Sequence, residues 1–568
     1  MIAGDEIPSW SGAEVVMAQQ TGGQAVVEVL TALGVERVFG VASVHNLAIA
    51  DAISRDGRIT WHPTRHEQGA VHAADGAARA TGRLGVAVVS TGPGTANAMG
   101  GIYEAAFASS RVLVLTGQVD APLLGRGDGA LHEADRQADM LRSLCRRVWT
   151  VRTRAEVPDA VASVAIDILT GRPKPGAVEI PFDLQMAVHD DPTVELRRPE
   201  PQRPAPDAIV AVAELLRGAQ RPLVLGGGGV PGGGAATEFT ALAERLGAPV
   251  LTTAEGRGAI REDHPLSLGP NIEQAAMAQT IEQADVVLAV GTRFQQAGPS
   301  QQNLHFPGRL VHIDADPTVL DRIHRTDVAV LGDAQVSLSA LLEALGPGGP
   351  IAQEGFVADA VAARGAIEAA SREGVGPDVG HIMDAIRSVL PDDGLVVKDA
   401  TIAAYVWGNR CMPVLEARTT MRPTANGIGP GLPLAIGAAA ATGRPTVLIN
   451  GDGGLMLSIG ELATVVELQL PLVVCVFNDR GYGVLRWLQD VTYGGRQSAV
   501  DLATPDFAGV GRAMGLEAQT VTSAHDFEAI FQTAVDSGRP WLIDVDLTAM
   551  SPMRMGISAD PAAAADRP

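Results

Sequence analysis

The sequence predicts an α/β protein built from three consecutive doubly wound parallel-sheet domains. Short continuous runs of Val, Ile and Leu alternate with Ala-rich segments of helical pattern, which is typical of parallel strands buried on both faces. Two segments rich in Pro, Gly or charge interrupt this alternation. The length of 568 residues suffices for about three to four domains of roughly 150 residues each.

The predicted strands are distributed over all three parts of the chain. In order, they are Gly85–Ser90, Val112–Thr116, Pro222–Leu225, Val286–Val290, Thr446–Asn450 and Leu472–Phe477. The interrupting segments, residues 190–207 and 346–355, are poor helix and strand formers and are interpreted as linkers. We therefore expect domains over residues 1–190, 206–345 and 375–550. The first and last domains share no recognisable sequence repeat.

Charge and cysteine content exclude several classes of function. The chain has 43 Lys and Arg against 65 Asp and Glu, a net charge of −22, which repels nucleic acid and anionic membrane surfaces. Cys145, Cys411 and Cys475 are far apart and form no CxxC pair, so neither a disulfide framework nor a structural zinc site is expected. Residues 1–10 lack a basic signal-peptide start, and no apolar run approaches roughly 18 residues. We expect a cytoplasmic protein outside the membrane.

The most informative motif is Gly451-Asp452-Gly453-Gly454, directly after a predicted strand, with Asn478 at the end of the next one. Parallel strands joined by a helix bring both segments to the carboxyl edge of one sheet, where ligands bind in such folds. The Asp452 carboxylate and the Asn478 amide oxygen suit Mg²⁺, which completes its octahedron with water and phosphate oxygens. The glycines allow close approach of a diphosphate. The motif predicts a magnesium and diphosphate site.

This motif resembles that of thiamine diphosphate (ThDP) enzymes, and the likeness extends over nearly the whole chain. Residues 65–82 (RHEQGAVHAADGAARATG) and 90–97 (STGPGTAN) are similar to segments of acetolactate synthases and related 2-oxo acid decarboxylases. The resemblance implies an N-terminal pyrimidine-binding domain, a Rossmann-like central domain and a C-terminal diphosphate-binding domain.

The resemblance also assigns roles around the cofactor. Glu67 is the carboxyl group that activates ThDP through a hydrogen bond to the pyrimidine nitrogen opposite the amino group. Ile428 lies where the family has the apolar residue beneath the bent cofactor, and the Asn426 carbonyl accepts from the 4′-amino group. Arg480 gives its backbone carbonyl to Mg²⁺. Thr401 and backbone N–H groups replace the amide side chain with which relatives hold the diphosphate.

The substrate-facing positions depart from the family pattern. Ala42-Ser43 replaces a Pro-Gly pair, and the following Val44 and His45 are expected to approach the reacting carbon near Gly92. His45 could shuttle protons, or it could be a loop histidine bound to backbone. His132 stands where acetolactate synthases usually have Gln, and the Leu-His-Glu triplet occurs in decarboxylase-like relatives of the arginine-derived type. Tyr482 and Trp487 are the remaining candidate pocket residues; Trp487 could equally be an ordinary buried tryptophan.

The central domain has an open role. Gly226–Gly229 follows a predicted strand, and Gly291-Thr292-Arg293 follows another. A glycine-rich turn alone is weak support for a nucleotide. The corresponding domain binds FAD in acetolactate synthases and is empty or differently occupied elsewhere, so FAD is a possible cofactor.

The resemblance implies a ThDP- and Mg²⁺-dependent enzyme that makes or breaks a carbon–carbon bond of a small 2-oxo acid. Acetolactate synthase-like decarboxylation with carboligation is the leading interpretation, and simple decarboxylation is nearly equal. A 2-hydroxyacyl-CoA lyase is a third possibility, although the sequence has no obvious basic cluster for CoA. A catalytically silent ThDP-fold protein should have lost Glu67, Asp452 or Asn478, and all three are present. A homodimer or homotetramer with active sites at subunit interfaces is implied.

Overall fold

The computed structural model describes residues 13–15, 20–189, 194–196, 200–295 and 304–553. The chain divides into two compact units, Met1–Glu200 and Pro201–Pro568. The N-terminal ten residues, on which the expectation of no signal peptide rests, lie outside the described residues, as do parts of the first predicted linker.

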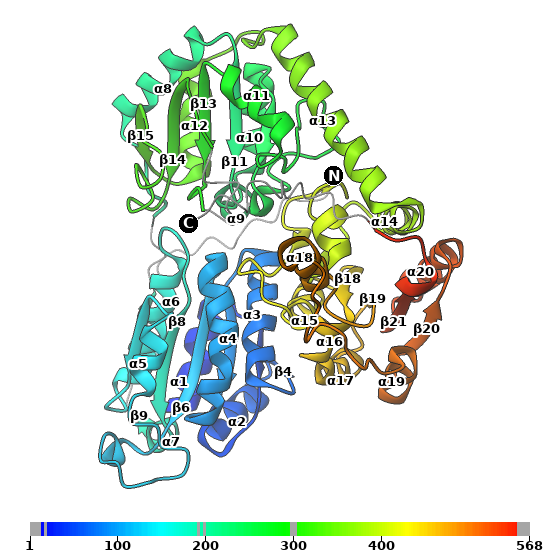
Figure 1. Cartoon of the computed structure of the whole chain (residues 1–568). Coiled ribbons are helices and arrows are strands. Elements are labelled where there is room, and N and C mark those ends of the chain that lie inside the picture. Colours follow the sequence, from blue (N-terminus) through cyan, green and yellow to red (C-terminus); the bar gives the residue numbers. More distant parts are fainter. Residues whose placement is uncertain (1–12, 16–19, 190–193, 197–199, 296–303, 554–568) are drawn as a thin grey trace. The chain divides into compact units, whose positions relative to one another are not determined.

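The first unit contains a six-stranded parallel sheet with the strand order β4-β3-β5-β6-β8-β7 (Figure 1). Its strands are β3 (Arg37–Gly40), β4 (Thr60–Pro63), β5 (Gly85–Val89), β6 (Val112–Gln118), β7 (Arg147–Thr150) and β8 (Gly176–Pro181). Helices α1 (Gly22–Ala32), α2 (Leu47–Asp56) and α6 (Glu156–Leu169) share one apolar core with alternate residues of the central strands. Helices α3 (Glu67–Thr81) and α4 (Pro93–Ala108) pack against each other. The central strands β5, β6 and β8 are buried at every position, whereas the edge strands β4 and β7 are partly exposed.

The second unit contains two parallel sheets, of which the central one has the order β12-β11-β13-β14-β15. Its strands are β11 (Pro222–Gly226), β12 (Val250–Thr252), β13 (Val286–Val290), β14 (Arg309–Asp314) and β15 (Val328–Leu331). The helices around it include α8 (Pro206–Gly218), α10 (Ala236–Leu246), α11 (Ala275–Gln283) and α12 (Ala334–Leu345). A long helix, α13 (Glu354–Val375), follows this domain.

The third sheet has the order β17-β16-β18-β19-β21-β20. Its strands are β16 (Leu395–Lys398), β17 (Thr420–Met421), β18 (Thr446–Gly451), β19 (Leu472–Asn478), β20 (Glu517–Val521) and β21 (Trp541–Asp546). Its helices are α14 (Pro377–Val389), α15 (Gly431–Thr442), α16 (Asp452–Met456), α17 (Leu462–Glu467), α18 (Gly483–Tyr493), α19 (Phe507–Met514) and α20 (Ala524–Ser537). A short π-helix, Ala404–Gly408, follows β16.

The first and third sheets have the same topology. If the strands of each sheet are numbered along the chain from β3 and from β16, both sheets have the order 2-1-3-4-6-5. In each, the order reverses between the first and third strands, which creates a crevice at the carboxyl edge where ligands bind in open α/β sheets. The first and third domains are therefore similar in strand order, although their sequences show no recognisable repeat.

The predicted fold class is confirmed, and all six predicted strands are present with ends that differ by at most two residues. Within the first predicted linker, the structure places β10 (Val194–Leu196), which pairs with β1 (Ala13–Val15), and the start of α8 at Pro206. The exact domain boundaries remain a prediction. All three cysteines are free. Among the described residues, none of the helices is both long enough and apolar enough to span a membrane.

Buried histidine makes the stability of the first unit depend on pH. His72 of α3 is 1% exposed, and burial lowers its pKa to about 3. Since the unfolded chain binds this proton near pH 6.5 and the folded chain does not, stability falls as the pH decreases below about 6.5. Between pH 7 and 5 this histidine should cost about 2 kcal/mol of unfolding free energy.

We expect His72→Gln to weaken this pH dependence, measured by urea unfolding of the whole chain at pH 7, 6 and 5. His525→Gln, which changes an exposed histidine of α20, is the matched control. Equal slopes for the wild type and His72→Gln would contradict the assignment.

Candidate active site

In the first unit, Glu67 lies at the first position of α3, beside the turn that follows β5. Its carboxylate accepts a hydrogen bond from the Asn97 side-chain amide at 3.0 Å. A methyl group added to Gly94 would lie 3.0 Å from the Glu67 Oε1 atom and 2.7 Å from the Ser90 Cβ atom. A glycine at position 94 thus lets α4 begin directly against the carboxylate, which is held in place by Asn97.

The same turn lies against the backbone of His132. Gly92 adopts φ +55° and ψ −108°, and a methyl group there would lie 2.3 Å from the His132 carbonyl oxygen. The buried Gln137 side chain accepts hydrogen bonds from the Gly92 N–H at 2.6 Å and from the Thr91 hydroxyl at 2.8 Å. Position 92 accommodates only glycine. The predicted residues Gly92 and His132 are therefore neighbours.

The imidazoles of His45 and His132 are in contact. Their ring centroids are 5.2 Å apart, and His45 is only 7% exposed. The Leu131 carbonyl accepts a hydrogen bond from the His45 ring, whereas Nδ1 has no partner among the described residues. Burial, and secondarily the neighbouring His132, lower the pKa of His45. This lowered pKa favours the neutral form of the His45 imidazole, and Val44 beside it is exposed.

In the second unit, Asp452 and Asn478 face the same turn. The Gly481 N–H donates to Asp452 Oδ2 at 2.8 Å, and the Arg480 N–H donates to Asn478 Oδ1 at 3.2 Å. Asp544 accepts from the Asn478 amide nitrogen at 3.2 Å, which orients the amide oxygen toward the turn. Burial raises the pKa of the Asp452 carboxyl. One carboxylate and one amide oxygen, placed together at the edge of the sheet, are hard ligands that suit Mg²⁺.

The third predicted metal ligand, the Arg480 carbonyl oxygen, already accepts two hydrogen bonds within the protein. The Arg480 carbonyl accepts hydrogen bonds from the Leu502 N–H at 3.0 Å and from the Arg486 guanidinium at 2.7 Å. Both lone pairs of this oxygen are therefore used by donors from α18 and from the segment that follows it. Asp452 and Asn478 fit the ion, whereas the Arg480 carbonyl would have to exchange a hydrogen bond for it. Among the described residues, no three His, Cys, Asp or Glu side chains gather to hold a metal.

The glycines of the motif form a cradle that side chains would fill. A methyl group on Gly451 would lie 3.2 Å from the Thr401 hydroxyl oxygen. One on Gly453 would lie 2.5 Å from the Tyr482 ring. Gly454 is similarly crowded, by the Asn450 side chain, whose buried amide has no partner among the described residues. Backbone without side chains, beside a hydroxyl group and an unpaired amide, is suited to binding a diphosphate. The structure therefore places the predicted residues Thr401 and Tyr482 beside the glycine motif.

The other predicted cofactor residues follow the strand β17. Asn426 has φ +58° and is exposed, and Ile428 is half-buried. The Asn426 side chain accepts a hydrogen bond from Arg422 at 3.0 Å, and Arg422 pairs with Glu255 of the central domain. The loop that carries Asn426 and Ile428 is thus tied to a neighbouring domain of the same unit.

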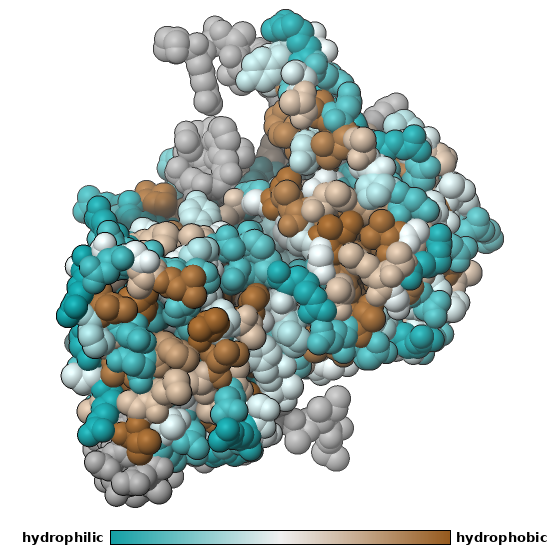
Figure 2. Space-filling view, turned by 90° about the horizontal axis from the view of Figure 1, so that it is seen from below, coloured by the Kyte–Doolittle hydropathy of each residue, from teal (hydrophilic) through white to brown (hydrophobic). Residues whose placement is uncertain are grey.

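Helix α18, which carries Trp487, leaves an apolar face uncovered within this chain. Its large side chains exposed by 40–56% are Leu485, Leu488, Val491 and Tyr493. Trp487 itself is half-buried. Figure 2 shows apolar patches among polar side chains on one face of the molecule.

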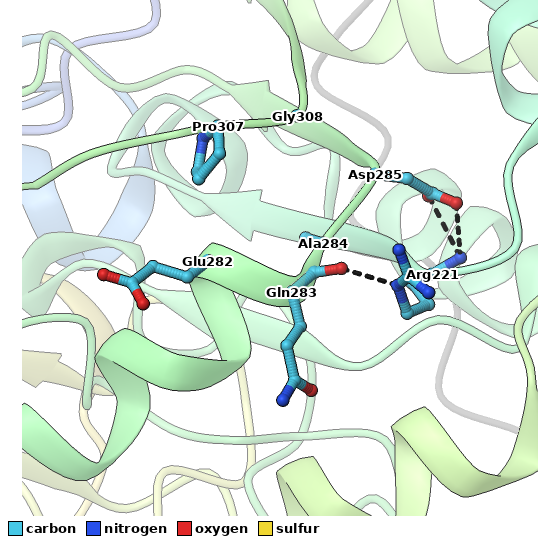
Figure 3. A pocket seen from close by; sticks show the side chains of 7 residues that line it. All are labelled: Arg221, Glu282, Gln283, Ala284, Asp285, Pro307 and Gly308. Carbon is cyan, nitrogen blue, oxygen red and sulfur yellow. Dashed lines mark hydrogen bonds between the residues drawn. The ribbon is translucent and has the colours of Figure 1, made fainter.

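A pocket of the central domain lies at the amino edge of the central sheet (Figure 3). It is lined by Arg221, Glu282, Gln283, Ala284, Asp285, Pro307 and Gly308. Residues 285 and 308 immediately precede β13 and β14, so the pocket is at the amino edge of the sheet. The Asp285 carboxylate already accepts hydrogen bonds from the Arg221 backbone N–H. In addition, ligands of such folds bind at the carboxyl edge of the sheet, not at the amino edge. We therefore do not regard it as the functional site.

Several residues that support the site have no role in the sequence interpretation. Asn97 holds Glu67, Gln137 holds the turn at Gly92, Asp544 orients Asn478, and Asp399 binds backbone N–H groups of two loops. Asn97 lies inside the segment of residues 90–97, which resembles a segment of the family. A polar residue inside such a motif could have been recognised from the sequence as a candidate supporting residue. Gln137 and Asp544 lie outside the motifs, so the sequence gives no such indication for them.

Comparisons with known proteins agree with these observations. Residues 20–140, 209–341 and 403–545 match, respectively, "Thiamine pyrophosphate enzyme, N-terminal TPP binding domain", "central domain" and "C-terminal TPP binding domain". The chain is 36% identical to "Probable 2-ketoarginine decarboxylase AruI" of Pseudomonas aeruginosa, over 89% of this chain and 91% of that protein. It is 32% identical to "Probable acetolactate synthase large subunit" of Methanocaldococcus jannaschii, over 92% and 91%.

A solved structure shares the fold. The X-ray structure of a candidate thiamin diphosphate-dependent enzyme from Mycobacterium smegmatis superposes with a TM-score of 0.78 at 24% identity. The superposition covers 93% of this chain and 99% of that one.

Proposed function

We propose an activity for this chain from the premise that it belongs to the thiamine pyrophosphate enzyme family, in which thiamine pyrophosphate is another name for ThDP. It is a ThDP-dependent enzyme of the acetolactate synthase and 2-oxo acid decarboxylase type. The proposed reaction is Mg²⁺-assisted decarboxylation of a 2-oxo acid, followed by protonation to release an aldehyde.

The chain's own residues have distinct tasks in this proposal. ThDP, when bound, supplies the electron sink for loss of CO₂. Asp452 and Asn478 hold the cation, while Thr401 and the glycine backbone at 451, 453 and 454 hold the diphosphate. Glu67 carries the proton exchanged with the pyrimidine ring, and Asn97 keeps its carboxylate oriented.

The contact between His45 and His132 is the observation from which we propose protonation to an aldehyde in preference to carboligation. The imidazoles of His45 and His132, whose ring centroids are 5.2 Å apart, are the groups proposed to relay this proton. The relative at 36% identity is described as a decarboxylase, which supports the same outcome. This reverses the order of the two leading interpretations of the sequence.

Carboligation is the second candidate. It is supported by relatives described as acetolactate synthases, including the isozyme 2 large subunit of Escherichia coli at 32% identity. A CoA thioester substrate has less support. Arg146, one of few candidate basic residues, is bound to Asp167 and to the Arg172 carbonyl, and Arg197-Arg198 lies outside the described residues.

The central domain is not proposed to bind FAD. The N–H groups of Gly227 and Gly229 donate to the carbonyls of Val290 and Gly291 at 2.8 and 2.9 Å. A methyl group on Gly227 would lie 2.3 Å from the Gly291 carbonyl oxygen. The glycine-rich turn is therefore used for packing two backbone segments, and these donors are unavailable to a flavin diphosphate.

We further propose a cytoplasmic homodimer or homotetramer, as the family resemblance implies.

A substrate panel tests this function. The wild type, supplied with ThDP and Mg²⁺, is incubated with linear, branched, aromatic and guanidino 2-oxo acids, and with a 2-hydroxyacyl-CoA. We expect CO₂ and aldehyde in equal amounts from at least one 2-oxo acid, only when ThDP is present. Hydroxyketone as the main product would favour carboligation, and formyl-CoA would favour the lyase. No ThDP-dependent product from any substrate would contradict the proposal.

A further inference from the structure

Asp399 occupies the centre of the loops at the carboxyl edge of the third sheet. It directly follows β16 and is 2% exposed. Its backbone N–H donates to the Ile449 carbonyl of β18 at 2.8 Å, so its position relative to the sheet is fixed. The side chain points away from this anchor and toward three neighbouring loops.

The Asp399 carboxylate accepts hydrogen bonds from backbone N–H groups of two separate segments. The Ala400 N–H donates to Oδ1 at 2.6 Å. The Gly429 N–H donates at 2.9 Å and the Gly431 N–H at 2.8 Å, both to Oδ2. Gly431 is the first residue of α15, so the carboxylate also lies at the positive end of that helix dipole. Hydrogen bonds to a buried carboxylate are among the stronger ones in proteins.

The third neighbouring loop is the Gly451–Gly454 motif. A methyl group on Gly454 would lie 3.4 Å from the Asp399 carboxylate carbon, so the two residues are neighbours. Asp399 thus hydrogen-bonds the loops that carry Thr401 and Ile428, and it lies beside the loop that carries Asp452. These are the proposed holders of the diphosphate, of the bent cofactor and of Mg²⁺.

We propose that Asp399 is a positioning residue, which sets the spacing between the diphosphate loop and the loop of Asn426 and Ile428. This inference rests on the proposed function, because it assumes that both loops contact ThDP. Asp399 itself contacts neither cofactor nor substrate in this proposal. Its negative charge is compensated by backbone N–H groups, so its loss releases both loops together.

Two variants perturb the contact in different ways. Asp399→Asn keeps the size of the side chain but turns one acceptor oxygen into a donor, so one N–H group loses its partner. Gly431→Ala keeps the carboxylate but places a methyl group 2.7 Å from the Asp399 Cβ atom and 2.8 Å from Oδ2. Position 431 has no positive φ, so alanine introduces no backbone strain there. The matched controls are Asp359→Asn, an exposed residue of α13, and Gly365→Ala, which has open space around it.

The test is a calorimetric titration of each full-length protein with ThDP at saturating Mg²⁺, alongside thermal unfolding without ThDP. We expect both Asp399→Asn and Gly431→Ala to raise the ThDP dissociation constant at least tenfold, and both controls to leave it unchanged.

Unchanged ThDP affinity in the two folded variants would overturn the proposal, whatever happens to their melting temperature. Loss of folding in both variants would also overturn it, because Asp399 would then be a core structural residue. Failure of the wild type to bind ThDP is a separate result and would contradict the proposed function instead.

Discussion

Glu67→Gln is expected to reduce turnover by about 10²- to 10⁴-fold, the range attributable to a positioned general acid–base group. Glutamine keeps the size of the side chain and can still accept from Asn97, but it cannot exchange a proton with the pyrimidine ring. Helix α4 begins beside this carboxylate, where a methyl group on Gly94 would lie 3.0 Å from Oε1. ThDP binding should change little, since the proposed diphosphate and metal contacts belong to other residues.

The measurement combines the rate of CO₂ release with the ThDP dissociation constant. Glu214→Gln, which alters an exposed glutamate of α8, is the control for a lost surface charge. Full activity of Glu67→Gln would refute the assigned role. Loss of activity through loss of ThDP binding would show that Glu67 is a binding residue instead.

Asp452→Asn should abolish Mg²⁺-dependent binding of ThDP, with an affinity loss of at least about 100-fold, or about 2.8 kcal/mol. The carboxylate supplies the negative charge that a divalent cation requires. Asparagine retains an oxygen that can accept from the Gly481 N–H, so the loop should keep its conformation. Asp452→Ala removes this acceptor as well and should cost at least as much.

The comparison of the two variants separates the ion from the loop. ThDP is titrated into each protein with Mg²⁺ and with EDTA, and Asp359→Asn serves as the control. If Asp452→Asn binds ThDP as the wild type does and only Asp452→Ala fails, the carboxylate holds the loop and not the metal. Unchanged affinity in both would refute the ligand assignment.

The sequence was sufficient for the fold class and for the buried strands. Runs such as Val286–Val290 are apolar at every position because both faces of a parallel strand are covered. Edge strands give no such signal: β20 (Glu517–Val521) is largely exposed and polar, and β7 (Arg147–Thr150) begins with an exposed arginine. The shared strand order of the first and third sheets was also invisible, because pairing depends on backbone contacts and not on sequence similarity.

The candidate site was predictable where its residues belong to contiguous motifs. Glu67, Asp452 and Asn478 have characteristic neighbours and spacing, and their roles remain predictions for experiment. Asp399 could not be assigned, since its partners are backbone N–H groups about 30 residues away. The engagement of the Arg480 carbonyl likewise depends on Leu502 and Arg486, which the motif does not include.

The central claim is that this chain binds ThDP and that Glu67 activates it, whichever 2-oxo acid is the substrate. The most direct measurement is the rate at which the C2 proton of bound ThDP exchanges with deuterium, with no substrate present. We predict exchange at least about 100-fold faster on the wild type than on Glu67→Gln. Equal exchange rates on the two proteins, both saturated with ThDP and Mg²⁺, would contradict the claim.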